Sequence, residues 1–293
     1  MSAAPKPGIY RDVPFAEYLS WPAVSNSGIK LALRSLAHFK ARHEIDPTPA
    51  MRLGSFLHCG VLEPLAIVQR YAVLPRYEQD AENVTRGGEK SSSTGTVYCK
   101  AKAQEFRAAN AGKEIVDEAD YKTLVGVHRA LMQSAKAREY LTERGDAEVS
   151  ILWHDPETEL PCKARIDFLN SGLNDLKSCA DAARFSNAIA DNGYHRQAAH
   201  YQNGYRVLTG ETKPFRLIAV ESKPPHGVRA APVHEDAIET GWSEVRRALL
   251  SIAEAYRADN WPSYVDPSSW CLPSWYGGGD AIELTINGET VSL

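Results

Sequence analysis

The chain has 293 residues, of which 43% are hydrophobic and 24% are charged, and its formal net charge is −4. A chain of this length and composition can bury a full-sized core and fold as one large domain or two modest ones. The slight acidic excess excludes a global basic field for nucleic acid, so any such contact must come from local patches.

Membrane proteins and disulfide-rich or metal–sulfur proteins are also disfavoured. The longest apolar runs are strand-sized, such as residues 217–220, whereas a membrane helix needs roughly 18 apolar residues. Residues 1–8 are predicted to form a flexible tail and lack a basic start followed by an apolar segment, so we expect a cytoplasmic protein. The five cysteines are scattered and never form a CxxC pair, which argues against a disulfide framework and an iron–sulfur cluster.

The N-terminal part, residues 9–141, is predicted to be mainly helical. Ser25 or Ser27 can cap the first turn of a short helical hairpin. Apolar residues at i, i+3, i+4, i+7 and i+8 predict a second helix that begins near residue 51 and ends before Pro64. Further helices are predicted over residues 99–110 and 117–141.

The polar stretch 78–96 is predicted to be a long loop, because it combines a Gly-Gly pair with a run of serines. Its basic residues Arg86 and Lys90 leave two interpretations open. It is either a solvated connection or a flexible flap over a polyanion.

In the middle of the chain the spacing of hydrophobic residues changes from a helical period to the alternation of strands. Residues 148–179 read as three strands joined by two turns, which is a β-meander. The next segment, up to Gly210, is predicted to be helical with a break at Asn192 and Gly193. A strand over 214–223 and a helix over 236–259 follow. This order predicts an α/β fold in which helices flank a central mixed sheet. We expect one domain over 9–293, made of the helical part, a central part over 146–210 and a C-terminal part over 214–293.

Charged residues are concentrated in the second hairpin of the meander. Alternation places Arg165 and Asp167 on one face of their strand, and Asp175 shares a face with Lys177 on the next. If residues 170–172 form the whole turn, Asp167 and Asp175 oppose one another, which destabilises a sheet surface by up to about 1 kcal/mol. Protonation, neighbouring cations or a divalent metal ion could offset this repulsion. A solvated ion-pair face on an edge hairpin is the alternative.

The stretch IDFLNSGLNDLKS, with an aspartate, a short turn and Asp-x-Lys, resembles the core of PD-(D/E)xK nucleases. GSFLHCGVLEP resembles the helix of RecB-type and RecE-type nucleases in which a histidine binds metal, and the histidine here is His58. Glu148 matches a glutamate on the family's preceding strand. Gln197 and Tyr201 match the Q-x-x-x-Y signature of the RecB branch.

Each of these matches has an alternative that the sequence leaves open. His58 could be a core histidine with a satisfied hydrogen bond, and Glu148 an ordinary surface residue of a strand. Gln197 and Tyr201, extended by Tyr194 and Tyr205 at helical spacing, could form an aromatic core stripe.

The outer segments are similar to RecE-type exonucleases, the exonuclease VIII group, so that the resemblance spans about residues 8–275. It implies a PD-(D/E)xK fold that hydrolyses DNA to 5′-phosphate products. More narrowly, it implies digestion of one strand of linear duplex from 5′ to 3′, leaving a 3′ overhang for a single-strand annealing protein. It also implies a ring-shaped homo-oligomer and a role in phage-type DNA recombination.

The resemblance implies roles for individual residues. His58, Asp167 and Asp175, with the carbonyl of Leu176, would hold Mg²⁺, for which Mn²⁺ could substitute. Lys177 would orient the attacking water, and Glu148 would belong to the catalytic set. The expected DNA contacts are Gln197, Tyr201, Arg165 and Tyr205.

Local basic clusters could add contacts to phosphates. They comprise Arg34, Lys40 and Arg42 near the first helices, and Lys100, Lys102 and Arg107 beyond the polar stretch. The rival functions are a structure-specific or restriction-type endonuclease of the same superfamily, a non-catalytic DNA-binding module, and a paired-carboxylate glycosidase. An intact Asp, Asp-x-Lys set disfavours the second, and Lys177 has no part in the third.

Overall fold

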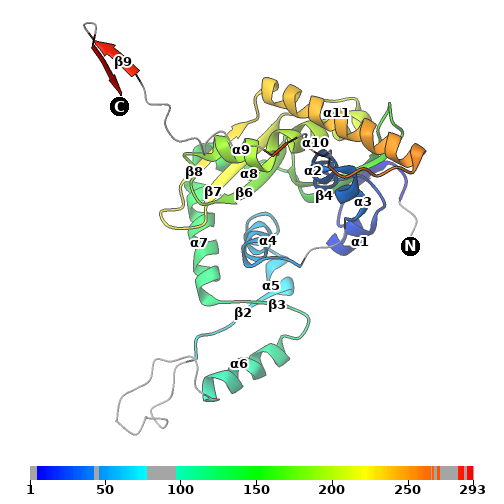
Figure 1. Cartoon of the computed structure of the whole chain (residues 1–293). Coiled ribbons are helices and arrows are strands. Elements are labelled where there is room, and N and C mark those ends of the chain that lie inside the picture. The colour runs from blue at the N-terminus through cyan, green and yellow to red at the C-terminus, as the bar shows by residue number, and fades with distance from the viewer. Residues whose placement is uncertain are drawn as a thin grey trace.

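A six-stranded mixed sheet with helices on both faces forms the centre of the computed structural model (Figure 1). The structure describes residues 5–42, 46–77, 97–264, 266, 269–270, 283–286 and 289–292. The strands follow the order β1 (Gly8–Tyr10), β4 (Asp146–His154), β5 (Pro161–Leu169), β6 (Leu173–Cys179), β7 (Phe215–Glu221) and β8 (Val228–Pro232). Only β6 and β7 pair in parallel; the other neighbours in this sheet are antiparallel. The predicted α/β class and the β4–β5–β6 meander are confirmed.

One layer of helices packs on the sheet through the larger hydrophobic core. This layer comprises α2 (Asn26–Arg34), α3 (Leu36–Lys40), α9 (Phe185–Asn192), α10 (Tyr194–Thr209) and α11 (Glu235–Ala258). Its core includes Ile29, Phe39 and Leu249 against Ile151 and Ile166 of the sheet. Because sheet side chains alternate between faces, the residues between these core positions point to the opposite layer.

The opposite face carries α1 (Phe15–Ser20), α4 (Pro49–Leu62), α7 (Glu118–Gln133) and α8 (Ala135–Thr142). Phe56 and Leu57 of α4 pack with Leu176 and Ile218 in a second core, and Tyr18 of α1 packs on Leu152 in a third. Figure 1 shows α4 and α11 on opposite sides of the sheet. The helix that carries His58 therefore covers the face on which α1 also lies.

Several boundaries agree with the sequence-based expectations. Ser25 caps α2 by accepting a hydrogen bond from the Gly28 N–H at 3.3 Å. The break between α9 and α10 falls at Gly193, whose φ of 73° suits glycine, and α10 ends at Gly210 with φ of 77°. Strand β7 and helix α11 also lie where the pattern predicted them.

The N-terminal part is mainly helical, as predicted, but it also contains three short strands that the sequence did not reveal. Strand β1 pairs with β4, so the predicted tail over 1–8 ends inside a strand at Gly8, while residues 1–4 lie outside the described residues. A short parallel pair, β2 (Tyr71–Val73) and β3 (Glu114–Val116), was also missed. Runs of three residues are too short for periodicity to reveal them.

The remaining differences concern helix breaks and peripheral elements. The predicted helix over 117–141 is interrupted at Ser134, which caps α8 through the Ala137 N–H. The other elements are α5 (Ile67–Arg70), α6 (Val97–Ala109), β9 (Glu283–Ile286) and β10 (Glu289–Ser292). The polar stretch 78–96, with Arg86 and Lys90, lies outside the described residues. Within the described part of the chain, none of the helices combines the length and hydrophobicity that crossing a membrane requires.

A buried histidine makes the stability of this fold depend on pH. His200 of α10 is 1% exposed, and its Nε2 lies 3.2 Å from the Lys163 carbonyl oxygen. Burial lowers the pKa of His200 from 6.5 to about 4. The unfolded chain therefore takes up a proton near pH 6.5, whereas the folded chain does so only near pH 4. We expect this contribution to be intact above pH 6.5 and to fall by about 1.4 kcal/mol per pH unit as the pH drops towards 4.

Urea unfolding between pH 4.5 and 7.5 measures this dependence. Other groups also titrate in this range, so the wild type is compared with His200→Gln and with a control, His154→Gln, at an exposed position of β4. The slope of the unfolding free energy against pH corresponds to the number of protons taken up on unfolding. This number should be smaller by about one in His200→Gln and unchanged in the control. Equal dependence in all three proteins would contradict the prediction.

Candidate active site

The turn between β5 and β6 is the predicted three-residue loop, but the hydrogen-bonded pairing of these strands ends before it reaches the two aspartates. Leu169 pairs with Leu173 and Phe168 with Asn174, and the pairing of β5 with β6 ends there. Strand β6 instead pairs with β7 along its whole length. Asp167 and Asp175 would be the next pair in this register but are not part of the ladder, so their predicted direct opposition stays a prediction. Asp167 Oδ2 accepts a hydrogen bond from the Leu176 N–H across the opening, at 2.9 Å.

The carboxylate that stands opposite Asp167 is Glu148 of β4. The flanking pairs are Ala147 with Phe168 and Val149 with Ile166, so the register places Glu148 across from Asp167. Glu148 has a φ of 53°, in the left-handed region that few residues other than glycine adopt. Such strain at a non-glycine residue is typical of functional positions, and here it interrupts the ladder at the carboxylate pair.

His58 completes a cluster with these two carboxylates. It projects from α4, and its Nδ1 lies 3.5 Å from Asp167 Oδ2. One ligand atom from each of His58, Glu148 and Asp167 lies within 4.8 Å of the others, and we call these three residues the metal-site cluster. Helix α4 is capped by Thr48 and starts with Pro49, which fixes its first turn. The sequence predicted His58 and Asp167 as ligands, and the structure brings both together.

Asp175 and Lys177 form an ion pair beside the cluster. Asp175 is 1% exposed, and its Oδ2 lies 2.7 Å from Lys177 Nζ in an ion pair. This oxygen is buried and accepts no hydrogen bond of good geometry. Its Oδ1 accepts a hydrogen bond from Gln197 Nε2 at 2.7 Å. The Lys177 ammonium lies 5.1 Å from the centre of the Tyr194 ring. Asp175 is thus held by its neighbours and is not one of the three clustered ligands.

The charges of the site are strongly coupled. Burial, and then the nearby Asp175, raise the pKa of Asp167 well above its usual value. Burial alone would lower the pKa of Lys177, but the carboxylates of Asp175 and Asp167 outweigh it and raise that pKa. Burial, followed by the Lys177 cation, lowers the pKa of His58. At neutral pH the site therefore offers a neutral imidazole and a permanent ammonium.

Arg165 neutralises Glu148 and ties the site to the N-terminal segment. Its Nε donates to Glu148 Oε2 at 2.5 Å, and its Nη1 donates to the Val13 carbonyl at 2.9 Å. The side chain is 11% exposed. Arg165 was predicted to contact DNA, and the structure instead occupies its guanidinium with protein partners. One of these partners belongs to the metal-site cluster.

The predicted DNA contacts on α10 also need correction. Tyr201 and Tyr205 are buried in the larger core, where Tyr201 packs edge-to-face on Phe215. Gln197 is 7% exposed and bonds Asp175. The alternative of an aromatic core stripe therefore describes the two tyrosines. The contact between Tyr194 and Lys177 was missed, although the glycine break at 193 marks the turn that positions this tyrosine.

Comparison with known proteins identifies the family of this chain. A family model described as "PDDEXK-like domain of unknown function (DUF3799)" matches residues 25–272, a segment that contains all five residues of the cluster and the ion pair. The chain belongs to this family. Comparison with curated proteins gave no match.

A solved structure from Eubacterium rectale, described as "Putative exonuclease", is similar in fold to this chain. The similarity covers 80% of this chain and 82% of that chain, with a TM-score of 0.51 and 16% sequence identity. At this identity the likeness concerns the fold. Together with the family model, this likeness shows that the protein has the fold of the PD-(D/E)xK nuclease superfamily, with the Asp, Asp-x-Lys set on adjacent strands.

The donor set of the PDDEXK-like site fits a divalent cation. Two carboxylates and one neutral imidazole are ligands that Mg²⁺ and Mn²⁺ accept, and Mn²⁺ tolerates the nitrogen better. The raised pKa of Asp167 reflects negative charges crowded in a buried place, a repulsion that a cation would relieve. The site therefore suits a divalent cation both in the type of its ligand atoms and in their negative charge.

The two predicted basic patches lie in different parts of the structure. Arg34, Lys40 and Arg42 belong to the layer of α2 and α3, where Lys40 lies over Trp261 and Arg42 over Phe39. This layer packs on the sheet face opposite to α4. The helices that carry Arg34 and Lys40 therefore lie on the other side of the sheet from the metal-site cluster, and Arg42 lines a separate pocket with Pro22 and Pro161.

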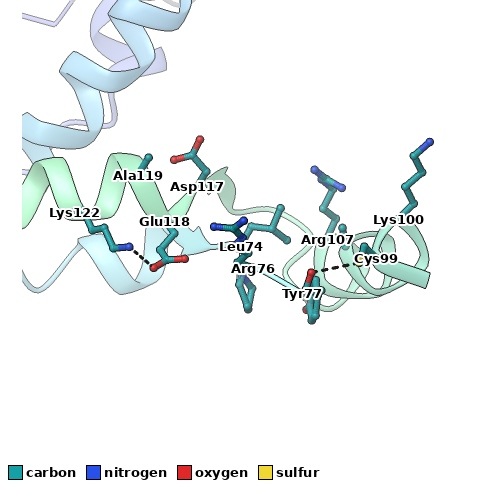
Figure 2. Close-up of a pocket in the computed structure, with 12 residues that line it drawn as sticks. Leu74, Arg76, Tyr77, Cys99, Lys100, Arg107, Asp117, Glu118, Ala119 and Lys122 are labelled. Carbon is teal, nitrogen blue, oxygen red and sulfur yellow. Dashed lines mark hydrogen bonds and ion pairs between the residues drawn. The ribbon is translucent and has the colours of Figure 1, made fainter. Parts of the chain in front are cut away.

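Lys100 and Arg107 project in the same direction from α6, next to a pocket of about 620 Å³ (Figure 2). Lys102, the third member of that patch, pairs with Glu105 at 2.8 Å. The pocket is also lined by Leu74, Tyr77 and the acidic pair Asp117 and Glu118. None of its lining residues belongs to the metal-site cluster, so this pocket lies away from the proposed chemistry.

Proposed function

We propose that the protein is a divalent-metal-dependent exodeoxyribonuclease. The observation that carries this proposal is the convergence of His58, Glu148 and Asp167 from three separate elements, with the buried Asp175–Lys177 pair beside them. A divalent ion held there would neutralise phosphate charge and polarise the phosphodiester. The resemblance to RecE-type enzymes and the description of the similar Eubacterium rectale protein as an exonuclease support the exonuclease class.

The residues of the site would have separate roles in the reaction. His58, Glu148 and Asp167 would hold Mg²⁺ or Mn²⁺. Lys177 stays protonated, so it would donate to the attacking water or to a phosphate oxygen and stabilise the developing negative charge. Asp175 would position Lys177, and Gln197 would position Asp175 through its hydrogen bond.

The finer part of the proposal rests on the RecE-type resemblance. It holds that the enzyme digests one strand of linear duplex DNA from the 5′ end and leaves a 3′ overhang for a single-strand annealing protein. It also includes a ring-shaped homo-oligomer, which would retain the DNA between successive cuts, and action in the cytoplasm during recombination. Salt-sensitive binding through few phosphates is expected, because the chain has no global positive charge.

Digestion of end-labelled DNA tests the proposal. Linear duplex labelled at either the 5′ or the 3′ end is incubated with the purified protein and Mg²⁺, and the released nucleotides are followed over time. We expect early release of the 5′ label as a 5′-phosphorylated nucleotide. With excess EDTA we expect no release, because EDTA removes the divalent cation that the proposed reaction requires.

Covalently closed circular duplex is the control substrate. It should remain intact, since an exonuclease requires an end. Cutting of the circle would replace the exonuclease by the endonuclease alternative, and earlier loss of the 3′ label would reverse the polarity. The absence of any hydrolysis with either Mg²⁺ or Mn²⁺ would contradict the nuclease proposal itself.

A further inference from the structure

Phe15 is an exposed aromatic residue in a chain that hides its other phenylalanines. It is the first residue of α1, and 59% of it is exposed. The structure describes all seven phenylalanines, and the other six are buried or half-buried. A single exposed apolar side chain is common on protein surfaces, so its surroundings must decide whether it has a role.

The Phe15 ring rests on a rigid support. It stacks on the buried ring of Tyr18, with centroids 6.2 Å apart and an interplanar angle of 23°. Tyr18 packs edge-to-face on Trp21 at 5.6 Å. The Lys163 ammonium donates to the carbonyls of Tyr18, Leu19 and Trp21 at 2.8–2.9 Å, which fixes the end of α1 to the sheet. A ring held in this way loses little conformational entropy when another ring stacks on it.

Arg165 connects this ring to the metal-site cluster. Its guanidinium carbon lies 5.7 Å from the centre of the Phe15 ring, within the range of a cation–π contact. The same guanidinium bonds the Val13 carbonyl, two residues before Phe15, and Glu148 of the cluster. One side chain thus contacts both an exposed aromatic ring and the metal-site cluster. Helices α1 and α4, which carry Phe15 and His58, lie on the same side of the sheet (Figure 1).

On the basis of the proposed nuclease function, we propose that Phe15 binds DNA by stacking on a nucleobase of the strand whose phosphate lies at the metal-site cluster. Bases and phosphates alternate along a strand, so a site that holds a phosphate has a base close by. Every base offers a π-face, so stacking would be independent of sequence, as digestion from an end requires. Leu19, one turn further along α1 and 41% exposed, extends the apolar surface. Phe15 would supply the aromatic contact that was predicted for Tyr201.

Steady-state digestion with Phe15→Ala, Phe15→Trp and a control, Leu250→Ala, tests this role. Leu250 is 42% exposed on α11, in the opposite layer. Stacking on an aromatic ring contributes enough that we expect Phe15→Ala to raise KM about 5- to 150-fold and to leave kcat within about threefold. Phe15→Trp should restore KM. Thermal unfolding and the native mass of each variant are measured in parallel.

A scan with abasic nucleotides identifies the base. Each of the first six nucleotides of the cut strand is replaced in turn by an abasic residue. At one position the wild type and Phe15→Ala should have equal KM values, because the stacking partner is missing from both complexes. The absence of such a position, an unchanged KM in Phe15→Ala, or an altered native mass of that variant would overturn the proposal. The last result would indicate a contact between protein chains.

These results are distinguishable from failure of the nuclease proposal. If the wild type does not hydrolyse DNA, binding of fluorescein-labelled duplex in Mg²⁺ is measured by anisotropy. Weaker binding by Phe15→Ala, reversed by Phe15→Trp, would then support the stacking role in a protein that binds without cutting. Equal binding by all variants, or no binding by any, would overturn it.

Discussion

Asp167→Asn is expected to lower the rate of DNA hydrolysis about 1000-fold while leaving the protein folded. Asp167 is the centre of the metal-site cluster, since it contacts His58 and stands opposite Glu148. Losing one charged ligand would remove several kcal/mol of charge stabilisation, and about 1.4 kcal/mol corresponds to a tenfold change in rate. Binding of Mn²⁺, measured by calorimetry, should weaken at least tenfold.

The thermal stability of Asp167→Asn should not fall together with its activity. Asparagine can still accept the hydrogen bond from the Leu176 N–H, and it removes a carboxylate that is crowded by Asp175. In metal-free buffer we therefore expect a midpoint of thermal unfolding equal to or above that of the wild type. The matched control is Asp146→Asn, since Asp146 lies on β4 but pairs with Arg11 at the surface. A control as inactive as Asp167→Asn, or an active Asp167→Asn, would remove Asp167 from the site.

Lys177→Met is expected to damage both activity and stability. Methionine keeps the length of the side chain but leaves Asp175 buried with Gln197 as its remaining polar partner. Removing one member of a buried ion pair typically costs about 3 kcal/mol or more, because the other charge stays desolvated. Loss of an ammonium aimed at developing charge should lower kcat by about 100- to 1000-fold.

A double variant separates these two effects. Asp175→Asn combined with Lys177→Met removes the unpaired charge, while asparagine can still accept the hydrogen bond from Gln197. Urea unfolding should show most of the lost stability restored, and the hydrolysis assay should show no recovery. Recovery of activity together with stability would mean that Lys177 acts only as a structural partner of Asp175.

The sequence alone determined the elements whose signals are local. Alternating hydrophobicity located β4, β5 and β6, and the tripeptide at 170–172 set the turn between the last two. Helical periodicity and a stop at Pro64 located α4 and thereby His58. Alternation also placed Arg165 and Asp167 on one face, where the structure has them. These features depend on neighbours in the chain, and neighbours are what a single sequence displays.

The tertiary structure decided which side chains meet. Asp167 clusters with Glu148 and His58, and the pairing of β5 with β6 ends before the two aspartates, because β6 pairs along its length with β7, a strand that follows it by more than thirty residues in the chain. The burial of Tyr201 and Tyr205 depends on α10 packing between the sheet and α11, and the place of Phe15 depends on three carbonyls that bind Lys163. Such choices result from competition among distant partners for hydrogen bonds and buried area. The sequence contains all the candidate partners, and the free energy of tertiary packing determines which of them pair.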